Sequence, residues 1–396
     1  MKRYVPLVVP HFGIKEIGFC LRGYFQRHQE EIFVQALSQM YLGRRVMLLS
    51  SGSAAFFLIL TALSQKSKQK EVVLPAYTAG NLITCVRQAG LVPVLCDISL
   101  EDFNLDFQSC LKAINKNTLA VIAVHMFGIG IAEIQDLAKK IPGGVYLIED
   151  CAQAMGSRVD NLPCGTFGDL SFFSFNRGKN LPVFSGGFIL AAEELLWQKL
   201  KDTCRQQRVK KEIAFSRMSL FAKTIGFASL NSQLVYKISQ PILSLFKDNQ
   251  PANSITVKEM PSFQVILGNL LLPKAQLWFS QRHHNGLRLY HLLKNFSGLR
   301  LPVLKPNVYP VFSRFPVLVE DQLRLSRIIL RLLQAGIECS SFYGQPLHHM
   351  FDLGYRKEDF PNACYLARHL LTLPVHPWVN EGDLEIMQEI FCEELR

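Results

Sequence analysis

Seven short apolar segments recur through the first half of the chain, and they limit its possible folds more than any other feature. Each is rich in Val, Leu, Ile or Phe and is bounded by turn residues. Such segments predict buried strands, and the sequences between the first five predict helices. This alternation indicates an α/β fold with a large, mostly parallel sheet. The predicted strands are Val46–Leu49, Val72–Leu74, Val92–Leu95, Leu119–Val124, Val145–Ile148, Leu170–Phe175 and Gly187–Leu190.

The remaining segments suggest two domains. Helical spacing of apolar residues covers Gly13–Leu42, Ala192–Lys211 and a long stretch that starts at Met260. Beyond it, strands and helices mix up to a final helix. A chain of 396 residues is long enough to form more than one domain. We therefore expect a large α/β domain over residues 1–250 and a smaller α+β domain over residues 251–396.

Composition indicates a globular protein of a reducing compartment. Hydrophobic residues make up 49% of the chain and charged residues 19%, which excludes a disordered protein. The ten cysteines include no C-x-x-C pair, which argues against a zinc site and a secreted disulfide framework, and favours the cytoplasm. The start, MKRYVPLVVPHFGI, is broken by prolines and does not read as a signal peptide. The uncharged window Val46–Gln65 contains Ser-Ser-Gly-Ser, which favours a strand, a turn and a buried helix over a membrane span.

The net charge of +11 is compatible with nucleic acid, anionic lipid or anionic small substrates as partners. The densest basic patch, Arg205–Lys211, has no interleaved aromatic residues and matches no nucleic-acid motif. Nucleic acid is therefore not expected as a partner.

One stretch, Gly144–Gly187, places two chemically useful side chains at neighbouring strand ends. The strand Val145–Ile148 runs into Asp150, and the strand Leu170–Phe175 leads to Lys179. In parallel sheets the chemistry lies just past the carboxyl ends of the strands. A carboxylate and an amine there suit pyridoxal phosphate, which binds covalently to a lysine while a carboxylate keeps its pyridine nitrogen protonated.

The string EDCAQA, followed by SFNRGKN, resembles the DegT-type aminotransferases. The ordered set of an EDxAQA string, a serine-containing FSF and a Lys-Asn pair is specific, whereas a lone Lys-Asn pair would carry no information. The resemblance extends from about Val9 to about Leu384 and is patchy between Arg205 and Pro261. It implies a fold-type-I enzyme that uses pyridoxal phosphate and aminates keto sugars with an amino acid donor such as glutamate. It also implies a homodimer with the cofactor near the subunit interface.

The resemblance assigns roles to residues around the two strand ends. Lys179 would hold the cofactor covalently and then move the proton between substrate and cofactor. Asp150 would pair with the pyridine nitrogen; the alternative for it is a strand-end acid that caps a helix. Gln153 resembles the glutamine that contacts the ring hydroxyl, and Glu149 is expected to be structural.

Phosphate binding needs backbone donors and the amino end of a helix. The SSGSA turn opens a helix after a strand and resembles the family's phosphate turn, which assigns Gly52, Ser53 and Ala54 to the cofactor. Ser174, in FSF, resembles the second phosphate hydroxyl. His125, in VHMFG, either lines the pocket or packs structurally.

The sequence departs from the family pattern at three places. Ala79 stands where an aromatic residue usually stacks on the cofactor ring, a contact worth about 0.5–1.5 kcal/mol; Tyr77 is the nearest replacement. Arg177 replaces an uncharged residue and either holds a carboxylate or phosphate or is simply exposed. The asparagine that reaches the phosphate of the other subunit cannot be placed in SITVKEM.

These departures leave alternative functions open. One is a non-catalytic or regulatory relative of the same fold, and another is a pyridoxal-phosphate-dependent sugar dehydratase or epimerase. The dehydratases of the family have histidine at the position of Lys179, so the lysine favours amino transfer. The sequence does not identify the sugar, the carbon position or the nucleotide or lipid carrier.

The stretch Ile213–Lys247 carries only positive charges among many large apolar residues. This composition suits a segment that lies in a membrane interface, and the neighbouring Arg205–Lys211 would add attraction to anionic lipid. Such peripheral contact would fit a lipid-linked sugar. The alternative, which we favour, is that the segment packs at the dimer interface or over the active site.

Overall fold

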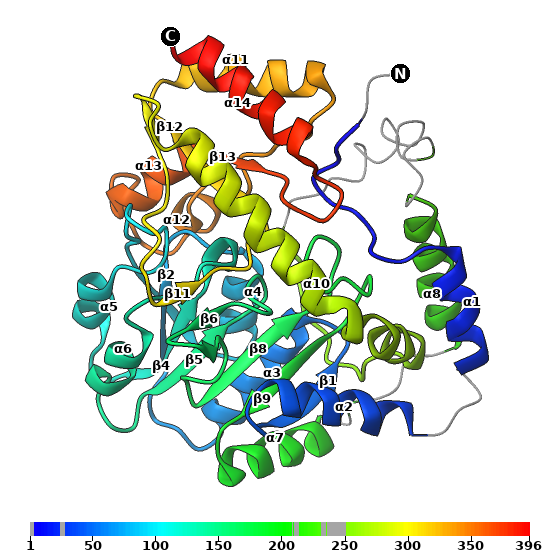
Figure 1. Cartoon of the computed structure of the whole chain (residues 1–396). Coiled ribbons are helices and arrows are strands. Elements are labelled where there is room, and N and C mark those ends of the chain that lie inside the picture. Colours follow the sequence, from blue (N-terminus) through cyan, green and yellow to red (C-terminus); the bar gives the residue numbers. More distant parts are fainter. Residues whose placement is uncertain (1–3, 24–27, 208, 210–213, 231–234, 236–250) are drawn as a thin grey trace.

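A seven-stranded sheet forms the centre of the computed structural model, which describes residues 4–23, 28–207, 209, 214–230, 235 and 251–396 (Figure 1). Its strand order is β1-β9-β8-β5-β4-β2-β3. All seven predicted strands are present, with ends that differ from the prediction by no more than two residues. They are β1 (Arg45–Leu49), β2 (Glu71–Pro75), β3 (Val92–Cys96), β4 (Thr118–Val124), β5 (Tyr146–Asp150), β8 (Leu170–Ser174) and β9 (Gly187–Ala191).

The sheet is mostly parallel, as predicted, and β9 alone runs against its neighbours β8 and β1. Parallel neighbours need a crossover connection, usually a helix, whereas antiparallel neighbours can be joined directly. The connection from β8 to β9 contains no helix, so the chain returns antiparallel. This connection carries Lys179, which the fold thereby keeps close to the carboxyl end of β8.

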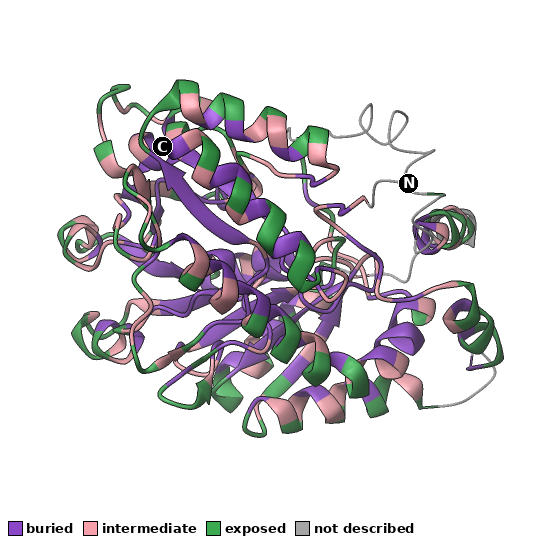
Figure 2. Ribbon diagram, turned by 45° about the horizontal axis from the view of Figure 1, so that its top comes forward, coloured by how far each residue is buried: buried purple, intermediate pink, exposed green. Residues whose placement is uncertain are grey.

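Helices cover both faces of the sheet, and the strands between them are almost continuously buried (Figure 2). Successive strand residues point to opposite faces, so Leu147 and Ile148 belong to different hydrophobic clusters. The cluster of Ile148 includes residues of α3 (Gly52–Ser64), α4 (Asn81–Gln88) and α7 (Glu194–Gln206). The cluster of Leu147 includes residues of α2 (Gln29–Met40), α5 (Phe107–Ala113), α6 (Ile134–Lys140) and α10 (Ser262–Leu293).

The C-terminal part is built on α10 and on a second sheet with the order β10-β12-β13. A third small sheet, β11-β6-β7, joins residues near 160 to residues near 308. The predicted domain boundary at residue 250 stays a prediction. Further described elements are η1 (Met126–Gly128), β6 (Arg158–Val159), β7 (Leu162–Pro163), β10 (Leu299–Arg300), β11 (Val308–Tyr309), β12 (Phe315–Val319), α11 (Gln322–Ala335), α12 (Leu347–Met350), α13 (Pro361–His369), β13 (Leu370–Leu373) and α14 (Glu381–Leu395).

The structure refines one predicted segment and confirms another. The helical stretch predicted over Gly13–Leu42 contains two helices, α1 (Ile14–Gly23) and α2. His28, directly before α2, has a φ of 64°, which a right-handed helix does not accommodate. The window Val46–Gln65 is the predicted strand, turn and buried helix, because β1 leads into α3.

Only part of the stretch Ile213–Lys247 lies within the described residues, mainly as α8 (Ala214–Ser229). The ring of Phe227 is buried and lies 6.0 Å from Phe12 and 5.6 Å from Phe184. Phe221 lies edge-on to Phe263 at 5.0 Å. Both aromatic residues therefore pack against other parts of the same chain. Among the described helices, none is long and apolar enough to cross a membrane.

Candidate active site

Asp150 lies at the carboxyl end of β5, beside Val124 of β4 and Phe172 of β8. Its side chain is buried, and its Oδ1 accepts a hydrogen bond of 2.9 Å from the amide of Ala152. Burial raises the pKa of Asp150, while the bond from Ala152 and the positive charge of Lys179 oppose that rise. The two predicted strand-end groups are therefore electrostatic neighbours.

Lys179 lies in the connection between β8 and β9, between a negative and a positive neighbour. Its pKa is lowered to about 8, chiefly by burial; the charge of Asp150 opposes this shift, and the charge of Arg314 adds to it. A lysine amine with this pKa is neutral often enough near pH 7 to react with a carbonyl. The structure thus gives Lys179 the property that the sequence prediction required.

Asn180 fixes the turn that carries the lysine. Its side-chain amide is buried, and its two N–H groups are shared among the carbonyl oxygens of Gln153 at 3.2 Å, Met155 at 3.0 Å and Val311 at 2.9 Å. These bonds connect the lysine turn to the segment after β5 and to the segment before β12. These hydrogen bonds explain why an asparagine directly follows the lysine in the Lys-Asn pair.

Gln153 is buried and oriented by a hydrogen-bond network. Its Oε1 accepts bonds of 3.1 Å from the amide of Phe127 and the hydroxyl of Ser313. Its Nε2 donates to the hydroxyl of Tyr343 at 3.2 Å. Asp150 raises the pKa of Tyr343 further, after burial, so the tyrosine lies near that carboxylate. Tyr343 is a site residue that the sequence analysis missed, since it lies far along the chain in a segment without a recognisable motif.

Arg314 is the second residue that the sequence analysis missed. Its guanidinium carbon lies 5.0 Å from the ring of Phe342, and its charge acts on Lys179, Tyr77 and Tyr343. Burial lowers the pKa of Arg314 to about 10, which still leaves the side chain charged at pH 7. Arg314 directly precedes the apolar strand β12, and this position was the signal in the sequence. The direction of its side chain could not be predicted from the sequence.

The predicted phosphate turn, at Gly52, lies against Ser174 at the carboxyl end of β8. A Cβ atom added to Gly52 would lie 3.0 Å from the Cβ of Ser174 and 3.1 Å from the carbonyl oxygen of Phe173, so only glycine fits there without adjustment. The amino end of α3 and the hydroxyl of Ser174 therefore lie together, with Ser53 half-buried in the first turn. The amide of Ala54 donates to the capping hydroxyl of Ser51 at 3.0 Å, and the predicted contact of Ala54 with the cofactor stays a prediction.

His125 is fully buried rather than facing a pocket. Its Nδ1 accepts a bond from the amide of Ile131 at 3.1 Å, so its Nε2 carries the proton and donates to Glu149 at 2.9 Å. Glu149 also accepts bonds from the amides of Gly165, Phe167 and Gly168. This geometry favours the structural alternative for His125 and supports the structural interpretation of Glu149.

The structure places two of the three departures from the family pattern, Arg177 and Ala79. Arg177 is exposed, and its guanidinium carbon lies 5.5 Å from the ring of Phe184. Ala79 is half-buried after β2. Tyr77 is fully buried and packs 5.5 Å from the ring of Tyr343, so it offers no free face for stacking. The structure therefore does not supply Tyr77 as a substitute for the missing aromatic residue.

The residues present fit pyridoxal phosphate. Lys179 offers an amine of lowered pKa for its aldehyde, and buried Asp150 offers a carboxylate for its ring nitrogen. The close approach of Gly52 to Ser174 at the amino end of α3 fits its phosphate.

Comparison with known proteins agrees with this arrangement. The model of the DegT/DnrJ/EryC1/StrS aminotransferase family matches residues 23–391. A dTDP-4-dehydro-2,3,6-trideoxy-D-glucose 4-aminotransferase of Saccharopolyspora spinosa is 27% identical over 88% of this chain and 83% of its own. A putative sugar aminotransferase from Streptococcus pneumoniae superposes with a TM-score of 0.79 at 19% identity, covering 98% of both chains. The Escherichia coli GDP-4-keto-6-deoxy-D-mannose-3-dehydratase superposes with a TM-score of 0.77 at 19% identity, covering 99% of this chain and 100% of its own.

The superpositions confirm the fold-type-I architecture, with its large mostly parallel sheet. The family match confirms the enzyme class predicted from the sequence, an aminotransferase that depends on pyridoxal phosphate. Because the matched region includes both strand ends and the C-terminal part, the chain belongs to the DegT/DnrJ/EryC1/StrS aminotransferase family.

Proposed function

We propose that this enzyme transfers an amino group from an amino acid donor such as glutamate to a keto sugar held on a nucleotide or lipid carrier. The observation that carries the proposal is the pair of Lys179 and Asp150 at neighbouring strand ends, with the pKa of the lysine lowered to about 8. The similarity to a sugar 4-aminotransferase over most of both chains supports the substrate class.

Pyridoxal phosphate supplies an aldehyde that receives the amino group and a ring that withdraws electrons from the substrate carbon. In our proposal Lys179 binds that aldehyde and, once released, moves the proton at the reacting carbon. Asp150 keeps the ring nitrogen protonated, and Gln153 contacts the ring hydroxyl. Gly52, Ser53 and Ser174 hold the phosphate, with the amino end of α3 adding partial positive charge.

Arg314 provides a positive charge for the substrate. A guanidinium can hold a carboxylate bidentately, which suits the amino acid donor, or the phosphate of a carrier. Its partly buried position beside Lys179 strengthens such an interaction because water screens it less. Arg177 is exposed on the same turn and is the second candidate for an anionic carrier.

Amino transfer remains favoured over the alternatives. The lysine at position 179 matches the aminotransferases rather than the dehydratases, and the intact pair with Asp150 is not needed by a protein that only regulates. The homodimer, the cytoplasmic location and a peripheral membrane contact of the stretch Ile213–Lys247 stay predictions.

The test uses the purified holoenzyme and has two stages. Glutamate alone should convert the bound cofactor to its amino form, visible as a change in its absorption spectrum, and a keto sugar nucleotide should then reverse that change. Borohydride reduction followed by peptide mapping should label the peptide that contains Lys179, and Lys179→Ala should lose both the label and the turnover. Label on another lysine would refute the assignment of Lys179. A spectrum that no amino acid changes would refute amino transfer.

A further inference from the structure

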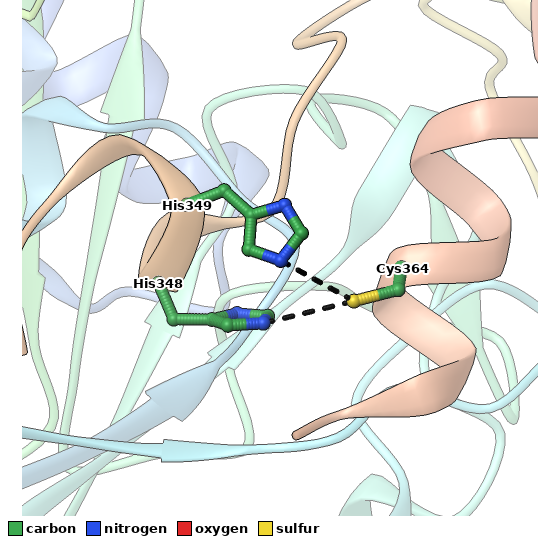
Figure 3. A group of neighbouring side chains, drawn as sticks. All are labelled: His348, His349 and Cys364. Carbon is green, nitrogen blue, oxygen red and sulfur yellow. Dashed lines mark hydrogen bonds between the residues drawn. The ribbon is translucent and has the colours of Figure 1, made fainter. Parts of the chain in front are cut away.

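We propose that His348, His349 and Cys364 form a second site, which binds a divalent transition metal such as Zn²⁺ (Figure 3). The two histidines lie on α12, and the cysteine lies on α13. Figure 3 shows both imidazole rings directed toward the sulfur. The absence of a C-x-x-C pair gave no sign of this site, because its ligands are brought together by the packing of two separate helices.

The distances between donor atoms match a tetrahedral ion. The Sγ of Cys364 lies 3.6 Å from the Nε2 of His348 and 3.8 Å from the Nε2 of His349. A tetrahedral Zn²⁺ with typical bond lengths places its sulfur and nitrogen ligands about 3.6 Å apart. Thiolate with imidazole is a ligand set that favours Zn²⁺ over Mg²⁺ or Ca²⁺.

A fourth donor lies at the same place. The carbonyl oxygen of Lys357 is 2.9 Å from the Nε2 of His349, 3.4 Å from that of His348 and 3.5 Å from the Sγ of Cys364. It can complete the tetrahedron, or water can do so, since His349 is exposed and leaves the site open to solvent. Without an ion, the same distances describe hydrogen bonds in which His349 donates to Lys357 and the thiol donates to His348.

A second cluster of possible metal ligands in the described part of the chain differs from this one, because its histidine and its carboxylate are already hydrogen-bonded. His125, Glu149 and Cys151 also lie within reach of one another. However, His125 uses both of its ring nitrogens, and Glu149 accepts three backbone amides, so these groups have little capacity left for an ion. The α12–α13 cluster has its Nε2 atoms and sulfur directed at one point instead.

The affinity of the proposed site for Zn²⁺ is expected to be moderate. Metal-binding histidines usually donate their second ring N–H to a carboxylate or carbonyl, which orients the ring. The buried Nδ1 of His348 has no partner in the described part of the chain, so that support is missing. The site is therefore expected to lose its ion to a chelator more readily than a closed four-cysteine site does.

An ion at this position would fix one wall of the active site. The amide of Leu347, at the start of α12, donates to the carbonyl oxygen of Ala76 at 2.8 Å. The segment just before α12 carries Tyr343, which contacts Gln153. By joining α12 to α13, the ion would hold that segment in place without touching the reacting atoms.

The test uses tag-free, full-length holoenzyme that has been treated with chelator and reductant and then titrated with Co²⁺. We expect one ion per chain, release of the thiol proton, and a thiolate-to-cobalt charge-transfer band that Zn²⁺ removes. Difference spectra against the zinc-loaded protein separate this band from cofactor absorption. Cys364→Ser should eliminate the band, and His349→Ala should weaken binding at least about tenfold.

Cys392→Ser is the matched control, because Cys392 is a half-buried cysteine on α14, outside the cluster. It should keep the band and the affinity. Zn²⁺ should also raise the melting temperature of the unmodified protein but not that of His349→Ala, since an ion that binds only the native state stabilises it. No uptake at micromolar Co²⁺, or an unchanged band in Cys364→Ser, would overturn the proposal and leave a hydrogen-bond network.

Discussion

The pKa of Lys179 gives a prediction that can be tested on the cofactor-free protein. At a pKa of about 8, roughly one amine in ten is neutral at pH 7, against about one in 3,000 at the ordinary value of 10.5. The reactivity of Lys179 toward a small neutral electrophile should therefore rise about tenfold per pH unit up to pH 8 and then level off. Burial is the main cause of the lowered pKa, and the neighbouring charges adjust it.

Two substitutions should move this midpoint in opposite directions. Asp150→Asn removes a negative charge that stabilises the protonated amine, so the midpoint should fall below that of the unmodified protein. Arg314→Gln removes a positive charge that opposes protonation, so the midpoint should rise. The spacing between the two midpoints measures the combined effect of both charges on the lysine.

The assay is timed chemical modification followed by peptide mass mapping. Exposed Lys116 provides an internal reference rate in every sample. Circular dichroism checks that each variant is folded. A midpoint near pH 10 in the unmodified protein, or variants whose midpoints shift in the same direction, would refute our account of the electrostatics at this site.

Three further predictions follow from single contacts. Asn180→Ala should lower the free energy of unfolding by about 2–4 kcal/mol in urea titrations, because three buried carbonyl oxygens lose the amide that they share, whereas exposed Asn117→Ala should change it little. Ala79→Phe should tighten pyridoxal phosphate binding or block substrate entry; unchanged cofactor affinity and kinetics would show that position 79 does not face the ring. In flotation assays at low salt we expect the protein not to rise with anionic vesicles. Flotation that is lost on replacing exposed Met218 and Ile225 of α8 with serine would instead establish a membrane contact.

The sequence by itself determined the sheet, and it predicted the two central residues of the candidate site. Strand positions were predictable because a short apolar run between turn residues can be satisfied only by burial, which is a local property of the chain. Asp150 and Lys179 were predictable because each follows such a run, and the ends of parallel strands meet at one edge. The Lys-Asn pair and EDCAQA added the family, since their order along the chain is itself informative.

Only the tertiary structure decided which distant side chains join these groups. Arg314 and Tyr343 reach Lys179 and Gln153 from the C-terminal part, and their direction depends on how that part packs against the sheet. The same non-local packing pairs His125 with Glu149 and brings Cys364 to the histidines of α12. Local periodicity fixes which face of an element is buried, but contacts between separate elements arise only when those elements dock.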